Sequence, residues 1–145
     1  MPPKQNVGGR KKARRLALQA LYSWQLSHNP LTEIETHILL EHQEEEFDLG
    51  YFRVLLHEVP AHLSEIELAL KPHVSRTIEE LDPIEWVVLH IATYELLKRP
   101  DIPYRVVINE ALELVKKFGA TESHKFVNGV LDKVARDLRS AEMAP

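Results

Sequence analysis

The sequence predicts an all-α protein, a compact single-domain bundle of about six or seven helices. Three observations support this class. Apolar residues recur at three- and four-residue intervals through most of the 145 residues. Prolines, glycines and short polar turns separate these periodic stretches. No stretch alternates apolar and polar side chains for long enough to indicate a strand. A chain of this length can enclose a hydrophobic core as one domain.

The first helix is expected from about Arg10 to Leu26, where a polar turn ends it. We expect residues 1–9 to be a flexible basic lead-in and residues 10–145 to form the domain. With about 100° of rotation per residue, one side of this helix should face the core. That side carries Leu16, Ala17, Ala20, Leu21 and Trp24. A second stripe should point outward, and it carries Lys11, Arg15, Leu18 and Tyr22.

Two further helices follow in the first half of the chain. Residues 31–45 should form one of them, which an acidic segment ends. Asp48 can cap the next helix through its side-chain oxygen. Pro60 lies inside the apolar pattern of that helix, so we expect a kink or a break there before the pattern continues to Leu70.

The clearest helix start in the sequence is at Asp82. This residue is a favourable N-cap, Pro83 occupies the first helical position and Glu85 the third. The proline-containing segment 98–103 should end the helix. The strong start signal and the apolar spacing after it predict a helix that lies against the core.

The last two helices flank Gly119, which is a favourable stop for the first of them. The final helix should begin near Thr121 or Glu122. Gly129 lies in its interior, where glycine costs about 1 kcal/mol relative to alanine, so either core packing or a partner should approach closely there. The pattern leaves open whether Phe126 belongs to the core or to its rim.

Positive charge is concentrated at the start of the chain. Six of the 18 lysines and arginines lie within residues 1–15, which hold none of the 22 acidic residues. Cations at a helix N-terminus oppose the helix dipole, which favours a functional use. Cations beside Tyr22 would suit single-stranded RNA, because its phosphates need charge and its bases stack on rings. The structural alternative is a solvated charge cluster with Tyr22 half-buried.

Other kinds of site lack the residues that they need. The chain has no cysteine, and the pairs His37/His42 and His57/His62 are spaced off a common helical face, so we expect no metal site. Glycine-rich phosphate loops and nucleophile motifs are also missing from the sequence, which argues against an enzyme and against a cofactor. No apolar run has the length of a membrane span, and we expect a cytoplasmic protein.

Three stretches resemble the NusB family of bacterial transcription antitermination factors: RRLALQALYSWQ, LDPIEWVVLHIATYELLKRPDIPYRVVINEALELVKKFG and the highly distinctive SHKFVNGVLDKVAR. The similarity spans about residues 10–139. It implies an all-helical, non-enzymatic protein that pairs with NusE, a ribosomal protein of the small subunit. The pair would bind single-stranded boxA RNA in ribosomal RNA leaders. With other Nus factors on RNA polymerase, it would suppress premature termination. Monomers and dimers both occur in the family, so a homodimer is possible.

The resemblance also implies which residues form the binding sites. The family's basic N-terminal motif matches Arg10, Lys11, Lys12, Arg14 and Arg15. Two arginines of that motif are lysines here, which lack the planar guanidinium group. Other RNA-facing positions match Tyr22, Glu122 and Phe126. The side that faces NusE would include Glu79, Glu80 and Glu85, whose negative charge suits a basic ribosomal protein.

Two other functions stay open from the sequence. The chain could be a protein-binding helical bundle in which the basic segment is inert. It could also be the accessory RNA-binding domain of an RNA methyltransferase, because NusB-like bundles precede the catalytic part of some RNA cytosine methyltransferases. Neutralising Lys11 and Arg15 would separate the first alternative from RNA binding, since only RNA affinity should fall.

Overall fold

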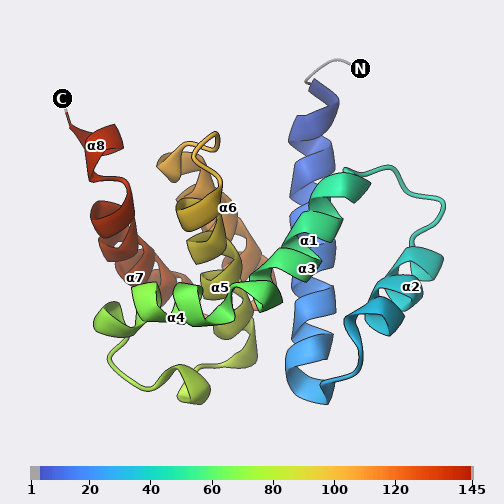
Figure 1. Cartoon of the computed structure of the whole chain (residues 1–145), viewed down its shortest axis with the longest axis horizontal. Coiled ribbons are helices and arrows are strands. Elements are labelled where there is room, and N and C mark those ends of the chain that lie inside the picture. Colours follow the sequence, from blue (N-terminus) through green and yellow to red (C-terminus); the bar gives the residue numbers. More distant parts are fainter. Residues whose placement is uncertain (1–3, 145) are drawn as a thin grey trace. The chain divides into compact units, whose positions relative to one another are not determined.

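The computed structural model describes the backbone of residues 4–144 and the side chains of residues 8–144. These residues form eight α-helices, two 3₁₀ helices and no strand, which confirms the all-α class (Figure 1). The elements are α1 (Lys4–Ser27), α2 (Leu31–Glu41), α3 (Leu49–Ala61), α4 (Leu63–Leu70), η1 (Lys71–His73), η2 (Ile78–Glu80), α5 (Pro83–Lys98), α6 (Tyr104–Phe118), α7 (Ser123–Leu138) and α8 (Ser140–Met143). The short α8 is the helix that the sequence did not predict.

The helices group into two compact units. The first unit contains α1 to α3, and the second unit contains α4 to α8 with both 3₁₀ helices. Each unit has its own buried apolar side chains. The predicted division into a lead-in and one domain remains a prediction, and residues 1–3 lie outside the described part of the chain.

Helix α1 forms the core of the first unit with α3, and α2 packs against both. The predicted core side is confirmed at Leu16, Ala17, Ala20 and Leu21, none of which is more than 4% exposed, whereas Trp24 is half-buried. The helix begins at Lys4, before the predicted start at Arg10. The prediction of an outward-facing stripe was wrong at Leu18, which is buried. Because two helices cover α1, its buried side is wider than one apolar stripe.

A polar cluster connects α2 to α3 in the first unit. Nε of Arg53 donates to Oε2 of Glu35 at 2.9 Å, and Nε2 of His57 lies 2.6 Å from Oε1 of the same carboxylate. Burial alone raises the pKa of Glu35, but the hydrogen bonds from His57 and Arg53 outweigh it and lower the pKa. The carboxylate therefore stays ionised and holds α2 against α3.

The cap at Asp48 and the break at Pro60 are present where the sequence predicts them, whereas α2 ends at Glu41 and not at residue 45. Oδ1 of Asp48 accepts from the backbone N–H of Tyr51 at 3.0 Å at the start of α3. Pro60 lies in the last turn of α3, and the helix ends one residue later, at Ala61. Local stereochemistry is enough for both features, since capping oxygens and proline act on neighbouring backbone groups.

Helix α5 is the centre of the second unit, and α4, α6 and α7 pack around it. Its residues from Glu85 to Leu96 are all buried, so this helix is enclosed on every side. Asp82 caps it as predicted, because Oδ1 accepts from the backbone N–H of Ile84 at 3.0 Å. The burial of Glu85 on such a helix requires polar partners inside the unit.

Two glycines behave differently in the second unit. At Gly119 a Cβ atom would lie 2.7 Å from the carbonyl oxygen of Val115, so a side chain does not fit at this helix end. At Gly129 a Cβ atom would have no neighbour within 4 Å, and the residue is exposed. Close core packing therefore does not explain Gly129 within the described chain, and the approach of a partner remains a prediction.

Candidate nucleic-acid interface

The basic segment of α1 is partly neutralised by the acidic segment between α2 and α3. Nε of Arg10 lies 3.5 Å from Oδ2 of Asp48, and Lys12 forms an ion pair with Glu45. The backbone N–H of Asp48 also donates to the carbonyl oxygen of Gly9 at 3.1 Å. Segment 42–48 therefore lies along the beginning of α1. It pairs with Arg10 and Lys12, two of the cations that the family resemblance assigns to RNA binding.

The ring of Tyr51, on α3, lies close to two arginines of α1, Arg10 and Arg14. The guanidinium carbon of Arg10 lies 4.2 Å from the centre of the Tyr51 ring, and that of Arg14 lies 5.5 Å from it. Arg14 is only 4% exposed, whereas Lys11 and Arg15 are partly exposed. Arg14 thus points into the first unit, which the sequence did not predict.

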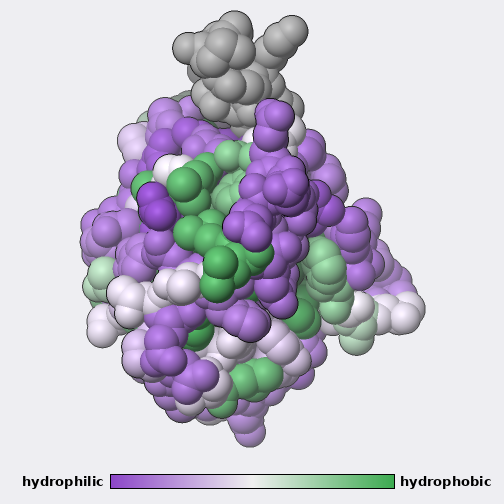
Figure 2. Space-filling view, turned by 90° about the vertical axis from the view of Figure 1, so that its right-hand side faces the viewer, coloured by the Kyte–Doolittle hydropathy of each residue, from purple (hydrophilic) through white to green (hydrophobic). Residues whose placement is uncertain are grey.

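Tyr22 is 37% exposed, so one part of its ring can be reached from solvent. Figure 2 views the side of the molecule on which α2 lies, where the surface is mainly hydrophilic and apolar side chains appear in small groups. Leu26 and Leu40 are among the exposed apolar residues of the first unit. On the face that Figure 2 shows, hydrophilic side chains surround the groups of apolar ones, so charged groups are available there beside exposed apolar surface.

The second unit presents a smaller set of predicted RNA-facing residues. Glu122 precedes α7 with a backbone φ of 82°, and its exposed carboxylate lies 2.7 Å from Nζ of Lys125. Phe126 lies one turn further along and is partly buried. The guanidinium carbon of Arg76 lies 4.7 Å from the centre of the Phe126 ring. Phe126 therefore belongs to the rim, in contact with a cation.

The three carboxylates predicted to face NusE differ in their surroundings. Glu79 and Glu80 are exposed on η2. The hydrogen bonds from Thr77 lower the pKa of Glu80, whose Oε1 accepts from the Thr77 backbone N–H at 3.1 Å. Glu85 is only 6% exposed, and its Oε2 accepts from Oγ of Ser123 at 2.9 Å. Glu85 is thus a buried acceptor within the unit rather than a surface charge.

Arg76 is a functional candidate that the sequence reasoning missed. It lies in the loop before η2, far along the chain from Phe126, and no periodic pattern includes it. Nη2 of Arg76 lies 3.4 Å from Oε1 of Glu85, so this arginine contacts both a predicted partner-facing residue and a predicted RNA-facing residue. Only the packing of the loop against α5 and α7 brings these groups together.

The described residues offer neither a metal site nor a membrane span. No group of three or more histidine and acidic side chains among them is arranged to hold a metal ion. No helix in this part of the chain is both long enough and apolar enough to cross a membrane.

Comparisons with known proteins identify the family that this chain resembles. The model of the NusB family matches residues 11–136. A transcription antitermination protein NusB of Pseudoalteromonas atlantica is 53% identical over 135 residues, which cover 93% of this chain and 96% of the relative. A protein of the same name from Pseudomonas putida strain W619 is 54% identical over 134 residues, covering 92% of this chain and 81% of that protein.

Solved structures that superpose on this chain come from the same family. NusB of T. maritima superposes with a TM-score of 0.80 at 29% identity, covering 92% of this chain and 96% of that one. A NusB chain crystallised with NusE and double-stranded RNA superposes with a TM-score of 0.82 at 28% identity, covering 90% and 98% of the two chains. Fold and sequence comparisons therefore point to one family.

Proposed function

The chain belongs to the NusB family, and from this premise we propose that it is an RNA-binding transcription antitermination factor that acts together with NusE. The observation that carries the proposal is the match to relatives named as antitermination proteins over more than nine-tenths of this chain. A NusB chain that superposes on this one was crystallised with NusE and RNA, which supports the same two partners here.

The RNA ligand that we propose is single-stranded boxA-type RNA. Phosphates would be held by the basic segment of α1, which contains Arg10, Lys11, Lys12, Arg14 and Arg15. The rings of Tyr22 and Phe126 would contact bases, and Glu122 would accept a hydrogen bond from a base or ribose. Arg14 would take part only indirectly, since it is buried against Tyr51.

The protein partner that we propose is NusE, bound at the acidic face of η2. Glu79 and Glu80 are exposed there, and their charge would attract a basic ribosomal protein. Glu85 would act from behind this surface, through the contact with Arg76. A larger complex with other Nus factors and RNA polymerase, a non-enzymatic role in the cytoplasm, and a possible homodimer complete the proposal.

A salt titration of boxA-type RNA binding tests the proposal. As an upper limit, neutralising six phosphates of a single strand gives log K a slope of about −4 against log salt. A fourfold rise in salt then weakens binding by at most roughly two to three orders of magnitude. A duplex of the same sequence serves as a comparison, because stacking on Tyr22 and Phe126 needs unpaired bases. An affinity that hardly changes with salt would contradict the proposal.

Charge-neutralising variants separate RNA binding from partner binding. Lys11→Gln combined with Arg15→Gln should weaken RNA binding and make the salt slope shallower by about 1.4, while NusE binding persists. Lys116→Gln combined with Lys117→Gln is a matched control, since both lysines are exposed on α6. Equal RNA affinity in the two double variants, with NusE binding intact, would favour a protein-binding bundle whose basic segment is inert.

A further inference from the structure

Arg76 and Phe126 form a cation–aromatic pair on the second unit. The guanidinium carbon of Arg76 lies 4.7 Å from the centre of the Phe126 ring, within the range of a favourable cation–π contact. The Arg76 side chain is 46% exposed and Phe126 is partly buried. A planar cation and a ring that lie together at the surface are the two components that a nucleotide needs, one for its phosphate and one for its base.

The donors of Arg76 are mostly unused within the described chain. A guanidinium has five N–H groups. One Nη2 donor of Arg76 lies 3.4 Å from Oε1 of Glu85, which is longer than a typical charge-assisted hydrogen bond. No other hydrogen-bond partner of this guanidinium is present among residues 8–144. Glu85 therefore orients Arg76 without saturating it, and the remaining donors can bind a phosphate in the bidentate manner.

The surroundings of Arg76 supply further donors. An open hollow of about 620 Å³ is lined by Lys71 and by residues 74–80. Lys71 contributes an ammonium group, and Ser75 and Thr77 contribute hydroxyl groups to this lining. Glu79 and Glu80 also line it and disfavour an anion beside them. The hydrogen bonds from Thr77 and, after them, the charge of Arg76 lower the pKa of Glu80, so Arg76 lies near this carboxylate and offsets part of its charge. Arg76 and Lys71 are the cations of this lining that an anion would contact.

We propose that Arg76 is an RNA-binding residue and that, with Phe126, it holds one nucleotide of the RNA. The guanidinium binds the phosphate, and the layer formed by the guanidinium and the Phe126 ring contacts the base. Glu85 is a positioning residue that orients Arg76 and is itself held by Ser123. This inference rests on the proposed function, because it assigns a new contact to the same RNA.

Two substitutions of Arg76 separate an RNA contact from a structural role. Arg76→Gln keeps a donor for Glu85 but removes the charge, so it should weaken binding of single-stranded boxA-type RNA about tenfold and make the salt slope shallower by about 0.7. Arg76→Lys keeps the charge and should preserve the slope while losing part of the affinity, since lysine lacks the planar group. Phe126→Leu should lower affinity with an unchanged slope.

Arg136→Gln is the matched control. This arginine lies on α7, as Phe126 does, its side chain is 69% exposed, and it pairs with Asp132 at 3.2 Å. Its removal should change neither RNA affinity nor salt slope. Denaturant unfolding of every variant checks that the binding measurements refer to folded protein.

The possible outcomes separate this inference from the proposed function. If the unsubstituted protein does not bind the RNA, the proposed function fails and the inference fails with it. If that protein binds but Arg76→Gln behaves like Arg136→Gln, only the inference fails. If Arg76→Gln loses NusE binding and keeps its RNA affinity, Arg76 is a protein contact and the inference is again overturned.

Discussion

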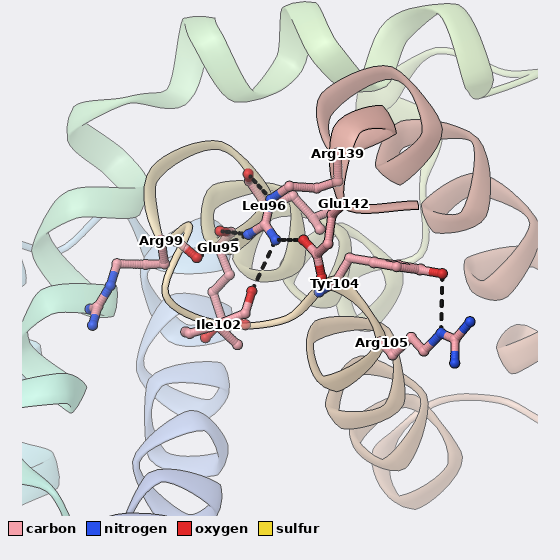
Figure 3. A network of polar contacts seen from close by, with 8 residues as sticks. All are labelled: Glu95, Leu96, Arg99, Ile102, Tyr104, Arg105, Arg139 and Glu142. Atoms are coloured by element: carbon pink, nitrogen blue, oxygen red, sulfur yellow. Dashed lines mark hydrogen bonds and ion pairs between the residues drawn. The ribbon is translucent and has the colours of Figure 1, made fainter. Parts of the chain in front are cut away.

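Arg139 and Arg76 are two arginines of the second unit with opposite surroundings. Arg139 is only 8% exposed, and all five of its N–H donors have acceptors. Four of these acceptors are backbone carbonyl oxygens, those of Glu95, Leu96, Arg99 and Ile102, at 2.9–3.2 Å, and the fifth is a carboxylate oxygen of Glu142 at 2.5 Å (Figure 3). Arg76, by contrast, is half-exposed and uses one donor on Glu85.

The position of Arg139 explains why all of its N–H donors have acceptors within the protein. The carbonyl groups of Glu95 and Leu96 belong to the last turn of α5; that of Glu95 also accepts from the backbone N–H of Arg99, whereas Leu96 is four residues before Pro100, which has no N–H. A cation at this end also interacts favourably with the helix dipole. Arg139 therefore closes the C-terminus of the buried central helix, and it connects α5 to the end of α7.

The difference between the two arginines shows what distinguishes a structural cation from a ligand-binding one in this fold. Both residues are arginines outside the α-helices, Arg139 between α7 and α8 and Arg76 in the loop between η1 and η2. What differs is how many donors the protein itself satisfies. A saturated, buried guanidinium contributes to folding, and a half-exposed one with unused donors remains available to an anion.

The largest effect that we predict is the loss of stability in Arg139→Ala. Removal of the guanidinium leaves the buried carbonyl groups of Leu96 and Ile102 without a donor, whereas those of Glu95 and Arg99 keep a backbone N–H donor. The free energy of unfolding should therefore fall by about 3–5 kcal/mol. Urea denaturation measures this change. Arg136→Ala, at an exposed position in the last turn of α7, should alter stability by less than about 0.5 kcal/mol. A loss below about 1 kcal/mol in Arg139→Ala would contradict the structural role of this guanidinium.

A smaller, pH-dependent effect should come from Glu142, which contacts the same guanidinium. The backbone N–H of Tyr104 donates to Oε2 of Glu142 at 2.9 Å. That bond, together with Arg139, lowers the pKa of Glu142 below its ordinary value of 4.5. The unfolded chain then binds more protons near this pH, so this stabilisation is present above pH about 4.5 and is lost as pH falls through the folded pKa.

Comparison with Glu142→Gln isolates this contribution. The difference in unfolding midpoint between the unsubstituted protein and Glu142→Gln should be largest near neutral pH and should shrink as the pH falls toward 3. The change should be smaller than that of Arg139→Ala, because the carboxylate is exposed. A difference that stays constant between pH 7 and pH 3 would contradict the role of the ionised carboxylate.

The smallest predicted effect concerns the first unit, where Lys12 of the basic segment is paired with Glu45. Lys12 is intermediate between Arg139, whose donors all have acceptors, and Arg76, most of whose donors have none. Its ion pair with Glu45 lies at the surface and is worth at most about 1 kcal/mol. Glu45→Gln should therefore raise RNA affinity about two- to threefold at low salt, and the gain should vanish as salt screens the charges.

Glu44→Gln is the matched control for Glu45→Gln. It removes the same charge from the same segment, and Glu44 is exposed. If both variants raise RNA affinity equally, general repulsion rather than the pair with Lys12 limits binding. RNA titrations at two salt concentrations distinguish these outcomes.

Much of the fold could be predicted from local sequence. The Asp82 cap, the break at Pro60 and the core side of α1 follow from hydrogen bonds and steric effects within about one helical turn. The family resemblance likewise depends on residues that are contiguous in the chain. These features need no knowledge of the tertiary structure.

The roles of individual charged residues could not be predicted in this way. Leu18 was expected on the outward stripe of α1, and Arg14 was expected to contact RNA. Both are buried, because α2 and α3 cover more than one side of the helix. Glu85 follows a surface-type capping pattern, yet it is buried beside Ser123. Each assignment failed where packing, rather than local pattern, determines exposure.

Local patterns along the chain are therefore enough to predict the helical class, the helix limits near prolines and caps, and the concentration of positive charge at the start of the chain. Which charged groups find partners inside the protein depends on how the helices pack. The contacts of Arg139 with α5, and of Arg76 with Glu85 and Phe126, join residues far apart in the chain. Helical periodicity describes one helix at a time, whereas the satisfaction of a guanidinium depends on the several segments that pack around it.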